Sequence, residues 1–188
     1  MNFPLPIQLT HKATGASVQG FIQPTTIFDL ELQRGWQYHK TDEDENWDWE
    51  SNYFECLQSE GRLECYSARV DQTLQGLMVL DLEGHRVAGE RSLGIDYLAA
   101  NPANRSLESG LKFVGVALFS VAILRSFERG MEGRLWLESL SGAQTFYERL
   151  GMRRHTRKSR AGYFIYSLET NRAKELLEKF RNDGILLA

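Results

Sequence analysis

The sequence contains little cysteine: Cys56 and Cys65 are the only two in 188 residues. Their spacing is neither that of a CxxC redox motif nor that of a zinc site, and two cysteines do not make the disulfide framework of a small secreted domain. The four histidines are scattered along the chain and do not complete a metal-ligand pattern. We therefore predict a cytoplasmic protein without a metal ion.

Long apolar runs and an excess of one charge are also missing. The longest apolar stretch, FVGVALFSVAIL at residues 113–124, is shorter than the ~20 residues that a membrane-spanning helix needs. The first residues, MNFPLPIQLT, lack the basic and then apolar pattern of a signal peptide. Because the formal net charge is −3, bulk attraction to nucleic acid is not expected. The sequence thus predicts neither a membrane nor a nucleic-acid partner.

What the chain does contain is typical of one globular domain. Hydrophobic residues make up 42% and charged residues 25% of the sequence, and no repeat or low-complexity linker interrupts it. We predict one domain over residues 1–188, in which residues 170–188 form a C-terminal helical extension. The long apolar segment and the free strand edges permit a homodimer.

Hydrophobic periodicity predicts strands and helices in alternation. The expected strands are residues 7–9, 17–22, 62–70, 74–82, 92–100, 134–138 and 162–168. The expected helices are residues 27–34, a segment that begins at Asn46 or Ser51, and residues 112–129, 141–150 and 171–180. Helices that connect strands, together with the hairpin at 62–82, predict an α/β fold with a mixed sheet.

The segment SGAQTFYERLGM, residues 141–152, places a tyrosine on an apolar helix face. The residues of that face follow helical spacing: Ala143, Phe146, Tyr147 and Leu150. Ser141 and Gln144 have the spacing of a capping box, and Gly151 is a helix stop. A core helix explains this pattern, but a buried tyrosine hydroxyl still needs a partner.

A second candidate site is the start of the apolar helix, KFVGVA at residues 112–117. Gly115 and Ala117 let a ligand approach the backbone, and the free N–H groups of a first helical turn favour a phosphate. Lys112 adds positive charge, and Arg105 in the preceding loop is either a second phosphate partner or a solvated arginine. Small residues in an apolar helix also serve packing, so both interpretations stand.

These motifs follow one another in a fixed order: a strand ending LAANPANR, K-x-x-G-x-A opening a helix, a short strand, and A-x-x-F-Y-E-R-L-G-M. The order resembles the GNAT superfamily of acyl-CoA-dependent N-acyltransferases, most clearly over residues 92–152. The resemblance implies an α/β fold with a mixed, mostly antiparallel central sheet and helices on both faces. It also implies a strand that binds pantetheine, a helix start that binds pyrophosphate, and a tyrosine near the thioester sulfur. The corresponding residues are Leu98, Ala99 and Ala100, then Arg105, Lys112, Val114, Gly115 and Ala117, and last Tyr147.

The implied activity is transfer of an acetyl group from acetyl-CoA to a primary amine, on a small molecule or on a protein lysine or N-terminus. At pH 7 about one lysine-like amine in 2500 is neutral, so deprotonation costs ~4.6 kcal/mol unless a base helps. Asp96 and Glu138 are the candidate bases, although each also fits a surface or capping carboxylate. Tyr147 is the candidate acid, since donating its proton to the leaving thiolate is uphill by only ~2 kcal/mol.

Two positions depart from the pattern of the superfamily. Lys112 stands where arginine or glutamine is usual, and Leu140 stands where an asparagine often precedes the tyrosine. A second hypothesis therefore stays open, in which the same fold binds acyl-CoA or a protein partner with little catalysis.

Two charged runs have alternative interpretations. TDEDENWDWE, residues 41–50, is either a solvated loop or a surface that attracts a cationic acceptor such as a polyamine, an aminoglycoside or a protein lysine. RRHTRKSR, residues 153–160, is either a contact for nucleic acid or another acidic partner or the solvated turn of a hairpin between the last two strands, and the negative net charge favours the turn.

Overall fold

The computed structural model describes residues 1–87 and 89–187, and its centre is a nine-stranded sheet with the order β6-β1-β2-β3-β4-β5-β7-β9-β8. The strands are β1 (Leu5–His11), β2 (Ser17–Pro24), β3 (Leu63–Val70), β4 (Thr73–Val87), β5 (Glu90–Ala100), β6 (Leu111–Lys112), β7 (Leu135–Ser139), β8 (Arg153–Lys158) and β9 (Phe164–Leu168). Neighbouring strands are antiparallel except β5 and β7, which are parallel. The prediction of a mixed, mostly antiparallel sheet is confirmed.

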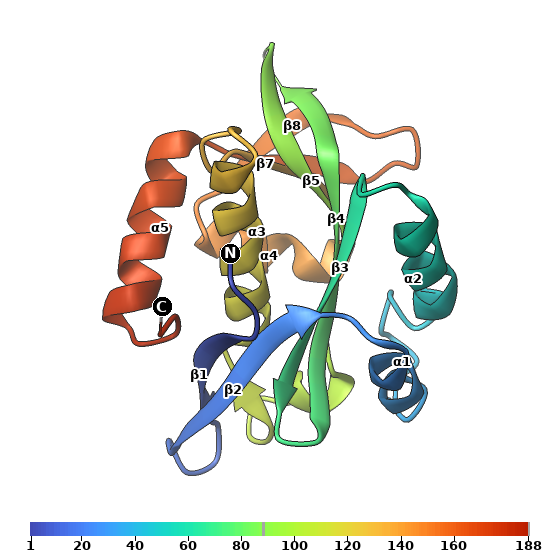
Figure 1. Cartoon of the computed structure of the whole chain (residues 1–188), viewed down its shortest axis with the longest axis vertical. Coiled ribbons are helices and arrows are strands. Elements are labelled where there is room, and N and C mark those ends of the chain that lie inside the picture. Colours follow the sequence, from blue (N-terminus) through green and yellow to red (C-terminus); the bar gives the residue numbers. More distant parts are fainter. Residues whose placement is uncertain (88, 188) are drawn as a thin grey trace.

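Helices cover both faces of this sheet, as predicted (Figure 1). They are α1 (Ile27–Gln33), α2 (Trp49–Gln58), α3 (Val114–Glu128), α4 (Gln144–Arg149) and α5 (Thr170–Asn182). The helices α3 and α5 lie on one face, and α1 and α2 lie on the other (Figure 1). Over the residues that the structure describes, no helix combines the length and apolarity needed to cross a membrane.

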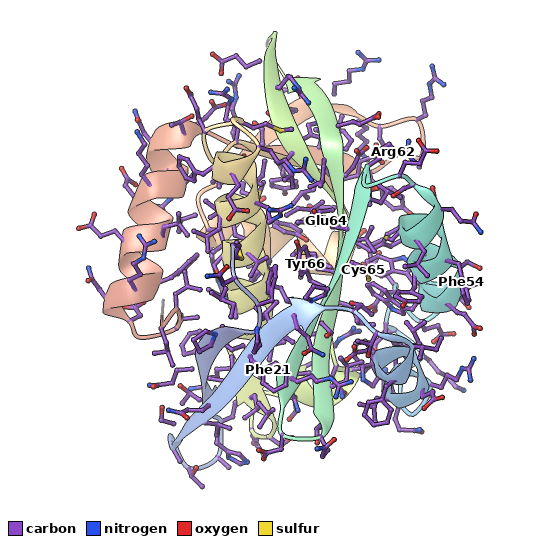
Figure 2. All side chains as sticks on the ribbon, viewed as in Figure 1. Phe21, Phe54, Arg62, Glu64, Cys65 and Tyr66 are labelled. Atoms are coloured by element: carbon purple, nitrogen blue, oxygen red, sulfur yellow. The ribbon has the colours of Figure 1, made fainter. Side chains whose placement is uncertain are left out.

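Each face has its own hydrophobic core. The larger core lies under α3 and α5 and includes Leu118 and Phe119, which are fully buried. The smaller core lies under α1 and α2 and includes Trp49 and Leu77. Strand β3 serves both cores by alternation, because Tyr66 points toward α3 while its neighbour Cys65 belongs to the core under α2 (Figure 2).

A charged network fastens α3 to the sheet. Arg125 donates from Nε to Glu64 Oε2 at 2.8 Å, and the Tyr66 hydroxyl donates to the same oxygen at 2.5 Å. Glu64 and Tyr66 lie two residues apart on β3 and therefore point to the same face, toward α3 (Figure 2). The C-terminal part of α3 is thereby held against the sheet, at the end of the helix opposite the candidate phosphate site.

The predicted C-terminal extension is packed into the larger core. Leu176 and Phe180 of α5 are buried in it, and a β-bridge joins Leu186 to Ile7 of β1. Residues 170–187 therefore share the core of the rest of the domain, and residue 188 lies outside the described residues.

Three local predictions are wrong. The basic run 153–160 is a strand over most of its length: β8 pairs with β9 at the sheet edge, where exposed charged side chains are common. The helix expected at Asn46 or Ser51 begins at Trp49, and Asp48 caps it by accepting the N–H of Ser51 at 2.9 Å. The segment 141–150 does not begin with a capping box: residues 141–143 form a 3₁₀ turn, α4 follows, and neither start has a side-chain cap from its own N-cap residue.

Candidate active site

The site begins where two parallel strands separate. Strands β5 and β7 pair only at Leu93–Ile95 and residues 135–137. Beyond that point β5 continues to Ala100, while β7 ends at Ser139. Within the described part of the chain, no strand pairs with residues 97–100 on the side toward β7, and on this stretch the Ala100 carbonyl accepts a hydrogen bond from Arg105. The separation leaves a free backbone edge on β5 that can accept another extended chain.

A β-bulge sits at the same point of β5. Val79 of β4 pairs with Tyr97 and the next residue, Leu80, pairs with Ile95, so Asp96 is the extra residue. A bulge re-aims the side chains around it and increases the local twist. Asp96 is exposed and lines the cleft described next, whereas its neighbour Ile95 is buried.

A cleft of about 1050 Å³ opens between the separated strands. Its walls come mainly from residues 41–47, β5, β7, and the starts of α3 and α4, and α2, β4 and the loops beside them add single residues. Eight of the predicted site residues line it: Asp96, Leu98, Ala99, Ala100, Arg105, Gly115, Glu138 and Tyr147. Residues far apart in the sequence are thus brought together around one cavity.

The other three predicted residues lie outside the lining. Lys112 is exposed on β6, where it pairs with Thr10 of β1. The side chains of Val114 and Ala117 are buried in the larger core. The N–H of Ala117 donates to the Phe113 carbonyl at 2.8 Å, so it is already engaged.

The start of α3 is uncapped and open toward the cleft. Phe113, the residue before the helix, has φ 74° and makes no side-chain cap. The first N–H groups of a helix have no acceptor within the helix. A Cβ placed on Gly115 would come 3.4 Å from the ring of Phe146 and 3.8 Å from Leu98, so glycine keeps the space above this turn clear. Free N–H groups at a helix start suit an anion such as a phosphate.

Tyr147 reaches the cleft from within the core. Its side chain is 6% exposed and packs against the rings of Phe119, Phe146 and Tyr166. Burial raises the pKa of the Tyr147 phenol well above its ordinary value. Among the described residues, none makes a hydrogen bond to its hydroxyl. The phenol is therefore a neutral donor at physiological pH whose proton is available to a ligand.

The acidic run is neither a free surface nor a simple solvated loop. Arg105 donates to Asp44 from both terminal nitrogens, at 2.8 and 2.5 Å, and its Nη1 lies 3.0 Å from Asp42. Arg105 also donates to the Ala100 carbonyl at 3.1 Å. Although burial acts in the opposite direction, the N–H of His39 and the guanidinium of Arg105 lower the pKa of Asp42. The guanidinium proposed for phosphate is thus bound to the acidic run.

Glu43 bonds to the opposite wall of the cleft. Its carboxylate accepts the backbone N–H of Gly142 at 2.7 Å and that of Ser141 at 3.3 Å. We call residues 42–44 the bridge, because they connect the segment after β5 with the segment after β7. The sequence carried no signal for this contact, since Glu43 and Gly142 are 99 positions apart.

The charge of the cleft is strongly asymmetric. Its lining has two guanidinium groups, Arg62 and Arg105, against seven carboxylates. The carboxylates are Asp42, Glu43, Asp44, Glu55, Asp81, Asp96 and Glu138. Three of them belong to the bridge, and the other four are carried by α2, β4, β5 and β7. Such a lining favours a cationic group over an anionic one. In residues 1–87 and 89–187, no three His, Cys, Asp or Glu side chains are placed so that they could hold one metal ion.

No protein-family model matches the chain, and none of the curated proteins matches it. Solved structures do match. A Tyr-to-Phe mutant of the AtaT toxin, bound to the C-terminus of the antitoxin AtaR, is 19% identical with a TM-score of 0.60, over 84% of this chain and 96% of that one. The PaiA N-acetyltransferase of Thermoplasma acidophilum, in complex with coenzyme A, is 18% identical with a TM-score of 0.56, over 80% and 98%.

A protein of Desulfovibrio desulfuricans described as a GNAT-family acetyltransferase is 15% identical with a TM-score of 0.57, over 80% of this chain and 99% of that one. At such identities the likeness establishes the fold. The chain has the GNAT fold, and the resemblance found in the sequence is confirmed at that level.

Proposed function

We propose that the protein is an N-acetyltransferase that moves an acetyl group from acetyl-CoA to a primary amine. The main support for this proposal is the separation of β5 and β7, which opens the cleft. A strand edge without a strand partner, an uncapped helix start and a buried tyrosine lie around that cleft. These three features supply hydrogen bonds to an amide arm, to phosphate and to a leaving sulfur, in that order.

Acetyl-CoA would lie along β5 and the start of α3. The backbone of Leu98, Ala99 and Ala100 is the edge left without a strand partner, and it suits the amides of pantetheine. The backbone N–H groups of Val114 and Gly115 suit the pyrophosphate, because both belong to the first turn of α3. Arg105 is assigned to the bridge rather than to phosphate, since two carboxylates already bind it.

The chemistry is a direct transfer without an enzyme-bound acyl group. The lone pair of the neutral amine forms a bond to the thioester carbonyl carbon, and the carbon–sulfur bond breaks as the tetrahedral intermediate collapses. The sulfur leaves with its electron pair and takes a proton, which gives free CoA. The nitrogen loses a proton to a base, which gives the amide.

Tyr147 donates the hydrogen bond that stabilises the leaving sulfur. Burial raises the pKa of its phenol, so complete proton transfer to the thiolate costs more than the ~2 kcal/mol expected from unperturbed pKa values. Tyr147 therefore contributes chiefly as a fixed donor whose bond strengthens as charge develops on sulfur, and the thiolate takes its proton from it or from solvent afterwards.

Asp96 and Glu138 are the proposed bases and also help to attract the acceptor. Both carboxylates are exposed and line the cleft, one at the bulge of β5 and the other on β7. Because the lining has seven carboxylates against two guanidinium groups, it attracts a cationic amine before the amine is deprotonated. A linear polyamine or the side chain of a protein lysine has this charge.

The competing hypothesis is a protein of the same fold that binds acyl-CoA or a protein partner without efficient transfer. The position of Lys112 outside the cleft and the leucine at position 140 support it. The two hypotheses differ in one product, free CoA released in response to an amine.

Cofactor use can be tested by thermal melting with acetyl-CoA and, at matched salt, with ATP as a phosphate control. At 100 times its Kd, a ligand adds ~2.7 kcal/mol of stability, which raises the Tm of a domain of this size by ~5–10 °C. We expect that rise with acetyl-CoA and not with ATP. Equal Tm values with and without millimolar acetyl-CoA would contradict the proposal.

A further inference from the structure

The segment that carries Tyr147 is short and lacks its own cap. Helix α4 has six residues, which is below the length at which an isolated helix is stable. Neither Leu140, before the 3₁₀ turn, nor Ala143, before α4, makes a side-chain cap. Its start is held instead from a distant part of the sequence, by the carboxylate of Glu43.

Glu43 is well suited to hold this start. A carboxylate at the N-terminus of a helical segment interacts favourably with the free N–H groups and with the helix dipole. Its bond to the Gly142 N–H, at 2.7 Å, is short for an N–H donor, as charge-assisted bonds are. A Cβ on Gly142 would lie 3.2 Å from Glu43 Oε2, so the absence of a side chain lets the carboxylate come this close.

The other end of this contact is fixed as well. Asp42 and Asp44 on either side of Glu43 both bind Arg105, and the side chain of Asp44 is 9% exposed. Arg105 in turn donates to the Ala100 carbonyl at the end of β5. A continuous series of bonds therefore runs from the end of β5, through the bridge, to the start of the segment that carries Tyr147.

We propose that Glu43 is a positioning residue for Tyr147. It binds Ser141 and Gly142, and through them it sets where α4 lies relative to β5, and so where the phenol meets the sulfur. Glu43 touches neither cofactor nor acceptor in this role. The inference rests on the proposed function, because it assigns Tyr147 its donor role, and it adds a residue from the acidic run to the machinery of the site.

The test uses Glu43→Gln and the matched control Glu45→Gln, in which an exposed glutamate of the same run loses the same charge. A displaced catalytic group lowers the rate steeply, so we expect kcat to fall ~10-fold in Glu43→Gln and to change less than ~2-fold in Glu45→Gln. The KM for acetyl-CoA should be equal in both variants, because the start of α3 and the edge of β5 are untouched. Gly142→Ala, which crowds the carboxylate, should reproduce the loss in kcat.

A double-mutant cycle separates positioning from a general loss of stability. If Glu43 acts through Tyr147, adding Glu43→Gln to Tyr147→Phe should lower the residual kcat no further. Hydrogen exchange of the amides in residues 141–149 should be faster in Glu43→Gln than in the wild type and unchanged in Glu45→Gln.

The possible results distinguish a failure of the positioning role from a failure of the proposed function. If Glu43→Gln keeps the full kcat, the inference is wrong. It is also wrong if Glu43→Gln lowers kcat ~10-fold in the Tyr147→Phe background as well. In both cases the proposed function stands, provided that the wild type transfers the acetyl group. If the wild type neither binds acetyl-CoA nor releases CoA, the proposed function fails and the positioning role fails with it.

Discussion

Two helical segments begin at the cleft, and they begin differently. At the start of α3, no side chain caps the first turn, and Gly115 keeps the space above it clear. At the start of the segment 141–149, the carboxylate of Glu43 covers the N–H groups of Ser141 and Gly142. Both starts present N–H donors that suit an anion, but only the start of α3 has them available for a ligand. Under the proposed function, the phosphates of acetyl-CoA would therefore bind at the start of α3, while the segment 141–149 carries Tyr147.

The largest expected effect is that of Tyr147→Phe, which removes the phenol donor from the segment 141–149. We expect kcat to fall by ~100-fold or more, which is the low end of the contribution of a positioned acid or base. The Kd of acetyl-CoA should stay within about twofold, because the phosphates bind at the other helix start. Steady-state kinetics together with calorimetric titration measures both quantities, and unchanged turnover would remove Tyr147 from the mechanism.

A carboxylate introduced at the start of α3 would make the two helix starts alike. Gly115→Asp places a negative charge in the first turn of α3, where it favours the helix but repels pyrophosphate. We expect the Kd of acetyl-CoA to rise ~30-fold, equivalent to ~2 kcal/mol. The control is Gly115→Asn, which adds a side chain of the same size without the negative charge. If both variants bind acetyl-CoA like the wild type, this helix start does not receive the phosphates.

Arg105→Met tests whether Arg105 fixes the bridge, and with it Glu43, at the start of the segment 141–149. The substitution leaves Asp42 and Asp44 without their cation, and a partly exposed pair of charge-assisted bonds is worth ~1.5 kcal/mol. For a domain of this size the Tm should fall by ~3–6 °C. The Kd of acetyl-CoA, measured for both proteins at the same salt concentration, should not change. A weaker affinity for acetyl-CoA would instead support the prediction from the sequence that Arg105 binds a phosphate.

The smallest effect concerns pH. Because the folded pKa of Asp42 is lowered, its ionised form adds stability that is fully present above its unfolded pKa of ~3.9. That contribution is lost as the pH falls below this value, through the lowered folded pKa. We expect Asp42→Asn to melt below the wild type at pH 5–7 by a constant margin, which shrinks from about pH 4 downward. A margin that is independent of pH down to pH 3 would mean that the charge of Asp42 does not contribute.

Much of the fold was accessible from the sequence because it depends on local patterns. The alternation at 62–82 and 92–100 identified β3, β4 and β5, and the apolar run at 113–124 identified α3 to within two residues at its start. The prediction of a turn at residues 153–160 is wrong because charged side chains indicate exposure, and an edge strand also exposes such side chains on both faces. Charge alone does not separate an exposed strand from an exposed loop.

Several residues that line the cleft were predicted for the same reason. Asp96, Gly115 and Tyr147 lie within motifs whose order is recognisable, and the structure brings all three to one cleft. The acidic run at 41–50 gave no indication of its partners, because Arg105 and Gly142 are reached only through the tertiary fold. The bulge at Asp96, likewise, is a matter of pairing between β4 and β5 rather than of the local sequence.

The proposed acetyltransferase activity is tested most directly by measuring the release of free CoA from acetyl-CoA on addition of primary amines. A linear polyamine, a lysine-containing peptide and an uncharged hydroxyl compound can be compared at equal concentration, with thiol detection and mass analysis of the acceptor. We predict release that saturates with a cationic amine, formation of its amide, and loss of both in Tyr147→Phe. A wild type that binds acetyl-CoA yet releases CoA at the background rate with every amine would contradict the proposed activity and favour a binding protein on the same fold.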